Sequence, residues 1–333
     1  MDKTPTRNYS FATWLHATGV GLILLCHFTQ QSGNPYLIMS SQFFNIGNDV
    51  FFILSGFLYG TRCGEYSDKN NWYWKRLLKI YVPYEMMLCF LLLVYLIQGR
   101  DVALIRWGIQ FAGVQGWNGV YGSAQTWFVT SILICYLFTP LISEFVYHAK
   151  EKQISRNWLL CFLILFPIAL AVFGNANSSS LFSPVCWYGI AFLWGAEFDK
   201  NERTRKGVVV ALLAMIGGFA ARLICRFLFD GTIFYDRIVA GYSHALGAFC
   251  IFYVFSVLFD NVEPIKPIAF IAGISYEIYL WHYMFTDGPL RLFGLTPIWV
   301  INSIITLIVS VTIAYCAHKA LNFIEIKVSA IRS

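Results

Sequence analysis

The chain has 333 residues, of which 58% are hydrophobic and 13% are charged. A soluble domain carries roughly 25% charged residues. Together with a mean hydropathy of +0.60, this composition excludes an ordinary soluble protein and indicates a polytopic membrane protein. The formal net charge is only +6, and no basic run with interleaved aromatic residues occurs, so we expect no nucleic-acid partner.

The nine cysteines predict neither a disulfide framework nor a metal site. Most of them lie in apolar stretches, Cys63 lies in a basic loop, and no CxxC pair is present. The N-terminus is short and polar, and the apolar run after it has no evident small-residue cleavage site. We therefore expect an uncleaved first span rather than a signal peptide.

Ten apolar stretches are long enough to cross a bilayer. They cover residues 11–30, 42–61, 77–97, 126–147, 158–174, 184–198, 207–225, 238–259, 268–286 and 297–318. With the N-terminus in the cytoplasm, the 24 lysines and arginines fall on or near the cytoplasmic side with six exceptions, namely Arg100, Arg106, Arg222, Arg226, Arg237 and Arg291. The predicted fold is all-α: a single integral-membrane domain over residues 1–333, with about ten transmembrane helices and both termini in the cytoplasm.

The first span carries two histidines, His16 and His27, eleven positions apart. On a helix they fall within roughly 20° of one face and differ in height by about 16 Å. This span runs outward, so His16 lies in the inner half of the membrane and His27 near the outer face. Ionisable groups in an apolar helix are costly, which favours a functional interior. The alternative is that either ring is simply packed and hydrogen-bonded between helices.

The second span runs inward and places Asp49 at a depth similar to that of His27. A carboxylate there would orient an imidazole and stabilise its protonated form. The alternative is a solvated aspartate at a helix end. Deeper in the same span, Ser55 and Gly56 allow another backbone or a thin ligand to approach closely.

The third span begins with a basic cluster, Lys75, Arg76 and Lys79. Arg76 and Lys79 are three residues apart and therefore share a helix face. The cluster predicts a cytoplasmic site for a polyanion, such as the phosphates of a nucleotide-based donor. The alternative is ordinary positive-inside anchoring.

Further polar and aromatic residues lie on or near the outer side. The outer loop at about 98–125 contains GVQGWNGVYGSAQTW, which predicts either a substrate mouth or an interfacial aromatic belt. The ninth span carries Glu277, which needs a partner such as Arg222 or a histidine. It also carries His282, a second candidate for an outer polar cluster. We assign no role to His318 at a cytoplasmic span end.

Five segments occur in the order seen in the acyltransferase-3 family of bacterial membrane acyltransferases, and the chain resembles that family over nearly its whole length; the segments are TWLHATGVGLILLCHF, DVFFILSGFLYG, YWKRLLKIYVPY, TWFVTSILICYLFTP and ISYEIYLWHYMF. The resemblance implies that His27 is the catalytic histidine. The family has an arginine where this chain has His16, and often two arginines where it has Arg76 and Lys79. Because histidine is shorter and only partly charged, weaker donor binding is expected.

The resemblance implies transfer of an acyl group, acetyl foremost, from cytoplasmic acetyl-CoA or another acyl-CoA to a hydroxyl of a cell-surface glycan or a lipid-linked saccharide. His27 is the expected general base, supported by Asp49 and His282. The donor is expected to contact His16, Lys75, Arg76 and Lys79. The expected location is the inner (cytoplasmic) membrane of a bacterial cell, in contact with membrane lipid and without a metal, with a homo-oligomer left open.

Several alternatives remain open at this point. The reaction could pass through an acyl-histidine intermediate instead of direct transfer. The acceptor could be a small molecule or an amine. A proton-coupled transporter would also explain intramembrane histidine and carboxylate groups, although it predicts inverted repeats that are not visible here. The third possible function, after acyltransferase and transporter, is that of a non-catalytic family relative that binds or exports glycan.

Overall fold

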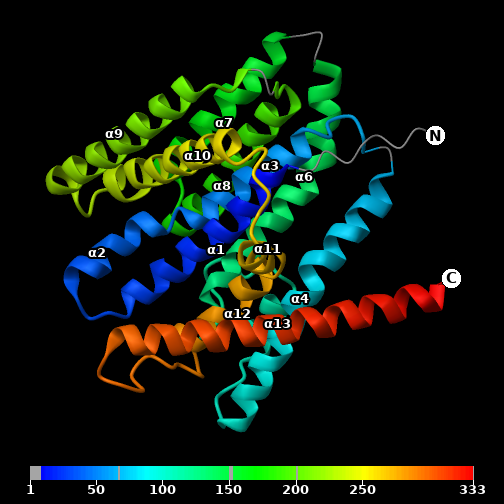
Figure 1. Ribbon diagram of the computed structural model, residues 1–333, viewed down its shortest axis with the longest axis vertical. Coiled ribbons are helices and arrows are strands. Elements are labelled where there is room, and N and C mark those ends of the chain that lie inside the picture. The colour runs from blue at the N-terminus through cyan, green and yellow to red at the C-terminus, as the bar shows by residue number, and fades with distance from the viewer. Residues whose placement is uncertain (1–8, 67, 150–152, 200–201, 333) are drawn as a thin grey trace.

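The computed structural model describes residues 9–66, 68–149, 153–199 and 202–332, and within these ranges it is helical without a strand. Figure 1 shows the arrangement of the helices. The elements are α1 (Ser10–Gln30), α2 (Pro35–Phe44), α3 (Gly47–Gly60), α4 (Lys69–Ile97), α5 (Leu104–Phe111), η1 (Ala124–Thr126), α6 (Trp127–Ala149), α7 (Gln153–Phe173), α8 (Ala176–Ala196), α9 (Arg205–Phe229), the π-helical turn η3 (Phe234–Val239), α10 (Ala240–Leu258), α11 (Lys266–Gly273), α12 (Ser275–Asp287) and α13 (Trp299–Arg332).

Eight helical segments in the described residues are long and apolar enough to cross a membrane. They are Ser10–Gln30, Pro35–Gly60, Lys69–Ile97, Ala124–Ala149, Ser155–Phe173, Arg205–Phe229, Phe234–Leu258 and Trp299–Phe323. The prediction of an all-α polytopic membrane protein is confirmed. The start of α1 and the end of α13 lie on the same side of the molecule (Figure 1), as a chain with both termini in one compartment requires.

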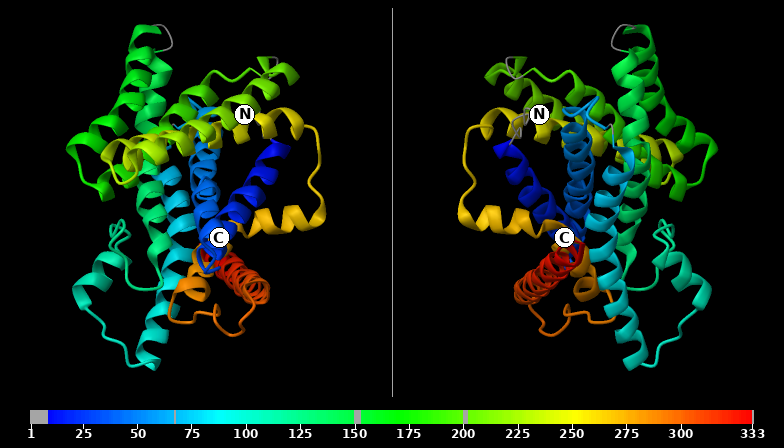
Figure 2. Two further views of the ribbon diagram at one scale, coloured as in Figure 1. Left: turned by 90° about the vertical axis from the view of Figure 1, so that its left-hand side faces the viewer. Right: turned by 90° about the vertical axis from the view of Figure 1, so that its right-hand side faces the viewer.

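The two remaining predicted spans, 184–198 and 268–286, form helices that fall outside this set. Helix α8 starts with the polar run 177–180, which lowers its mean hydropathy. The stretch 268–286 is broken near Ile274 into α11 and α12, of 8 and 13 residues. Each is shorter than the roughly 20 residues that span a bilayer. Figure 2 shows the long loop that leads from α10 to α11 along one edge of the molecule.

Glycines bring α3 and α8 into direct backbone contact. A Cβ atom added at Gly56 would collide with the carbonyl oxygen of Tyr188, and one added at Gly60 would collide with that of Phe192. From the other helix, Gly195 faces the carbonyl of Phe57 in the same way. Small residues four apart let transmembrane helices approach closely. The close approach predicted at Gly56 is thus made by the backbone of α8.

Helix α1 crosses α3 between its two histidines. A Cβ atom at Gly47, the first residue of α3, would meet the carbonyl oxygen of Gly19 and the side chain of Ile23. Gly19 and Ile23 lie between His16 and His27 in the sequence, so the crossing separates two regions of α1. One region faces a cavity, and the other faces α12.

Candidate active site

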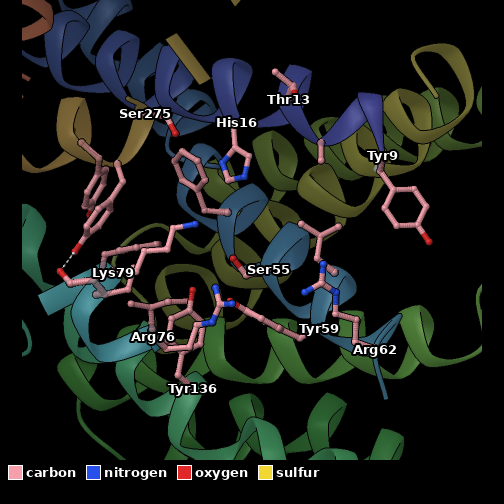
Figure 3. A pocket seen from close by; sticks show the side chains of 18 of the residues that line it. Tyr9, Thr13, His16, Ser55, Tyr59, Arg62, Arg76, Lys79, Tyr136 and Ser275 are labelled. Atoms are coloured by element: carbon pink, nitrogen blue, oxygen red, sulfur yellow. Dashed lines mark hydrogen bonds between the residues drawn. The ribbon is translucent and has the colours of Figure 1, made fainter. Parts of the chain in front are cut away.

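A cavity of about 480 Å³ lies beside the N-terminal half of α1, between α3, α4, α6 and α12 (Figure 3). Arg62 and Lys79 on its lining are exposed, so the cavity opens at the side predicted to be cytoplasmic. Its polar lining comes from five elements and the turn that follows α3, and comprises Tyr9, Thr13, His16, Ser55, Tyr59, Thr61, Arg62, Arg76, Lys79, Tyr136, Ser275, Tyr276 and Tyr279.

Within the part of the chain that the structure describes, three cations and no carboxylate line this cavity. The charged ends of Arg62, Arg76 and Lys79 turn toward the same space in Figure 3. The guanidinium of Arg76 lies 5.2 Å from the ring centroid of Tyr59, and its Nε is buried without a hydrogen-bond partner. Positive charge gathered in a concave site attracts anions, and arginine in particular binds phosphate oxygens.

His16 shares this cavity with Arg76 and Lys79, as the sequence predicted for a common site. Its ring centroid lies 5.7 Å from that of Phe51, and its buried Nδ1 has no hydrogen-bond partner. Lys75 is exposed and does not line the cavity, so its predicted contact with the donor stays a prediction. Arg62 was missed because it stands in the loop after the second predicted span, where positive-inside anchoring is the ordinary expectation.

His27 and His282 face each other at the opposite end of α1. Their ring centroids are 5.1 Å apart and their planes differ by 35°. The structure therefore brings together the two histidines that the sequence placed near the outer face. His282 is fully buried, whereas His27 is half-buried, so His27 is the more accessible member of the pair.

Hydrogen bonds assign the tautomers of this pair. Nδ1 of His282 lies 2.7 Å from the carbonyl oxygen of Tyr279, and Nδ1 of His27 lies 3.1 Å from Oε1 of Gln30. The Tyr279 carbonyl can only accept, so Nδ1 of His282 carries the proton; Nδ1 of His27 carries it with the Gln30 amide oriented as Oε1, and a neutral ring in this tautomer has a bare Nε2. Nε2 of His282 is buried without a partner. An imidazole with a bare Nε2 can accept a proton from a bound hydroxyl.

Asp49 is buried in the first turn of α3 and forms no hydrogen bond or ion pair with either histidine. The side chains beside His27 come from α12 instead. The ring of Tyr283 packs edge-to-face against His27 at 5.1 Å and 84°, and its hydroxyl donates to Oδ2 of Asp287 at 3.4 Å. The four-residue spacing of Tyr283 and Asp287 was the signal in the sequence that could have linked them.

An aromatic wall separates the cavity from the histidine pair. Phe51, Phe128 and Tyr279 line the cavity, with 4.9 Å between the ring centroids of Phe128 and Tyr279. Tyr279 also lies 5.9 Å from the ring of His282, on the far side of the wall. Its hydroxyl donates to the backbone carbonyl of Gln125 at 2.5 Å, which fixes the ring. Tyr279 therefore borders both polar regions.

Glu277 anchors α12 to α13 by a short contact between Oε1 and Nδ1 of His318, at 2.7 Å. Its partner is thus a histidine, one of the two alternatives considered for it, and His318 gains a role that the sequence did not suggest. The other alternative, Arg222, instead contacts His244 and the backbone carbonyl of Gln42. The Glu277–His318 contact holds the helix that carries both Tyr279 and His282.

The outer aromatic loop folds back onto the bundle. Trp117 stacks on Trp127 at the start of α6, with ring centroids 4.7 Å apart, and remains 41% exposed. The hydroxyl of Tyr121 donates to the carbonyl of Gly288 at 3.2 Å, directly after Asp287. The loop therefore borders the end of α12 that carries the residues around His27.

Comparison with known proteins places these features in a family. The model of the acyltransferase domain family, Acyl_transf_3, matches residues 10–319 and so covers both the cavity and the histidine pair. The chain belongs to the acyltransferase-3 family. The matched residues include His16, at the position where the sequence leads us to expect the family's arginine.

Among the residues that the structure describes, no group of three or more His, Cys, Asp or Glu is arranged to hold a metal ion.

Proteins similar to this chain include O-acetyltransferase OatA from Staphylococcus aureus strains NCTC 8325 / PS 47, COL and MRSA252. Each is 22% identical in an alignment of 275 positions that covers 72% of this chain and 45% of the relative. The match thus spans less than half the length of these relatives. No solved structure was found to match the chain.

Proposed function

We propose that this acyltransferase-3 protein transfers an acetyl group from acetyl-CoA to a hydroxyl of a cell-surface glycan or its lipid-linked precursor, in the inner membrane of a bacterial cell. The observation that carries the proposal is the placement of two polar regions along α1. A cationic cavity surrounds His16, and a histidine pair with bare Nε2 atoms lies beyond an aromatic wall. The acetyl group follows from the similarity to relatives named O-acetyltransferase.

The cavity suits the phosphates of a coenzyme A donor. Arg62, Arg76 and Lys79 would pair with phosphate oxygens, and the unpartnered Nδ1 of His16 would hydrogen-bond deeper along the donor. From His16 to His27 the helix rises about 16 Å, which is roughly the reach of a pantetheine arm. The donor would therefore enter from the cytoplasm and present its thioester to His27 past Phe51, Phe128 and Tyr279.

His27 is the proposed general base. As the acceptor oxygen attacks the thioester carbonyl carbon, Nε2 of His27 takes the hydroxyl proton. The carbon–sulfur bond then breaks, and the leaving thiolate recovers the proton from the His27 imidazolium. His282 would accept a hydrogen bond from a second group of the acceptor through its own bare Nε2. Asp49 is buried in the first turn of α3 and forms no hydrogen bond with either histidine, so no step of the proposed reaction is assigned to it.

Mass spectrometry of surface polysaccharide tests this function. Cells that lack the gene would receive the wild-type protein, the His27→Ala variant, or His148→Ala as a matched control at an exposed position outside both polar regions. We expect acetylated glycan with the wild type and the control, and none with His27→Ala at equal protein level. Glycan that stays equally acetylated with His27→Ala would contradict the proposed base, and glycan unchanged by the gene itself would contradict the proposed reaction.

A further inference from the structure

We propose that Asp287, acting through Tyr283, is the acidic positioning residue for the His27 ring, in the role that the sequence suggested for Asp49. The inference rests on the proposed function, because it assigns the carboxylate that serves the same general base. It concerns a residue outside the predicted site, at the last turn of α12.

The three side chains form a continuous contact. Tyr283 meets the His27 ring edge-to-face at 5.1 Å, and its hydroxyl reaches Oδ2 of Asp287 at 3.4 Å. Residues four apart lie on one helix face, so α12 presents Tyr283 and Asp287 together toward α1. His282, the neighbour of Tyr283, contacts the same His27 ring. Two side chains of one helix therefore border the proposed base.

The local backbone holds Asp287 in place. Gly288 ends α12 in an extended conformation, and a Cβ atom there would lie 2.7 Å from the backbone oxygen of Met284, so the turn needs glycine. The amide of Leu292 then bonds back to the carbonyl of Phe285 at 2.8 Å. With the bond from Tyr121 to the Gly288 carbonyl, these contacts fix the end of the helix that carries Asp287.

Asp287 is also the carboxylate that acts electrostatically on His27. The other titratable or charged groups on the elements around this end of α1 are engaged differently. His282 is bonded to backbone carbonyls, Arg291 donates to Oε1 of Gln31 at 2.8 Å, and Asp49 makes no hydrogen bond with the pair. On α10, which also packs against α1, His244 bonds to the Gln42 carbonyl. Negative charge beside His27 thus comes from α12.

This charge has a defined consequence for the reaction. When His27 takes the acceptor proton, its ring becomes an imidazolium, and a nearby carboxylate stabilises that form. Replacing Asp287 by asparagine keeps the size and the hydrogen bond from Tyr283 but removes the charge. His27 is then harder to protonate, so the rate falls and inhibition by acid begins at a lower pH.

The test measures kcat, the KM for acetyl-CoA and the pH dependence of kcat/KM for purified protein in lipid vesicles. We expect Asp287→Asn to lower kcat about tenfold or more and to leave the KM for acetyl-CoA unchanged. The fall of kcat/KM at acidic pH, the acidic limb of the profile, should move to lower pH. Asp287→Glu should return the acidic limb to its wild-type position. Asp230→Asn, the same change at an exposed site at the end of α9, is the matched control.

Two results would overturn the inference. One is a fall in kcat with Asp287→Asn while the acidic limb stays in place, since that marks a structural role. The other is movement of the limb with Asp49→Asn and not with Asp287→Asn. If Asp287→Asn does not fold, Tyr283→Phe decides, because without the hydroxyl the Asp287 carboxylate is no longer held beside the His27 ring, and the acidic limb should move in the same direction by a smaller amount. Failure of the proposed function itself would show separately, as a wild type without acetyl transfer or a fully active His27→Ala variant.

Discussion

Arg62, Arg76 and Lys79 bring three positive charges to one cavity, and no carboxylate is among the described residues that line it. The spacing of Arg76 and Lys79 predicted their common face, because both lie on one helix. Arg62 could not be assigned in the same way, since its position depends on how the turn after α3 packs against α4. A pattern along one helix gives height and face, but it does not give contacts between helices.

Removing one of the cavity cations should weaken donor binding. We expect Arg76→Gln to raise the KM for acetyl-CoA about tenfold or more, because a desolvated charged hydrogen bond is worth about 1.5–3 kcal/mol, and Arg62→Gln to raise it less, because Arg62 is exposed and its charge is screened by water. Initial rates at varied acetyl-CoA measure this effect. Lys206→Gln, at an exposed position in the first turn of α9, controls for net charge. A change confined to the KM of the acceptor would count against a donor site in this cavity.

His16 is the departure from the family pattern that the cavity makes testable. Its partly buried ring contacts Phe51 and leaves Nδ1 unpartnered. We expect His16→Arg to lower the KM for acetyl-CoA, because arginine adds a permanent charge and a planar set of donors. The assay is the same titration of donor. An unchanged KM would mean that this position makes no contact with the donor.

Asp49 shows that the depth of a residue along its helix is not enough to predict which side chains it contacts on other helices. The sequence correctly placed His27 and His282 near one another, and it placed Asp49 at a similar height. Contact also depends on which way each helix face turns, and Asp49 forms no hydrogen bond with the pair. The charged group beside His27 comes from the end of α12, whose position is fixed by the turn at Gly288.

Helices α3 and α8 are held together by a glycine interface that carries one wall of the cavity, through Ser55 and Tyr59. The sequence suggested a close approach at Gly56 but left open whether a backbone or a ligand makes it. It also missed that the second span divides into α2 and α3 and that α11 and α12 are separate helices. Breaks of this kind depend on packing, because local hydropathy continues across them.

Adding a methyl group at this interface should destabilise the protein. We expect Gly56→Ala to cost about 1–3 kcal/mol, because the new Cβ would collide with the Tyr188 backbone carbonyl. Thermal unfolding in detergent measures the loss. Gly217→Ala in α9, where a Cβ atom would meet nothing within 4 Å, is the matched control and should be neutral or slightly stabilising. Equal melting temperatures for the two variants would contradict the interface.

The whole molecule presents its cationic cavity on one side and its histidine pair toward the other. This arrangement agrees with a donor that is cytoplasmic and an acceptor that is reached from outside. The overall class followed from composition and charge placement, because apolar length and the distribution of lysine and arginine depend little on packing. The position of Tyr279, which lines the cavity and also lies beside the ring of His282, became visible only in the structure.

Orientation in the membrane can be measured directly. In a cysteine-free background, a cysteine at Asn177 should react with an impermeant reagent added outside intact cells, and one at Thr204 should not. Both positions are exposed. Asn177 lies in the first turn of α8, and Thr204 lies beyond the other end of α8, directly before α9. Labelling at Thr204 and protection at Asn177 would reverse the topology and place the cationic cavity on the outer side.

The most direct test of the account is the turnover of purified His27→Ala protein with labelled acetyl-CoA and acceptor glycan in lipid vesicles. Removal of a general base typically costs 10²–10⁴-fold in rate. We therefore expect the variant to insert and melt like the wild type, to bind acetyl-CoA with unchanged affinity, and to transfer no more than about a hundredth of the label. A well-folded His27→Ala protein that retains more than about a tenth of wild-type turnover would contradict the account, because it cannot have lost its base.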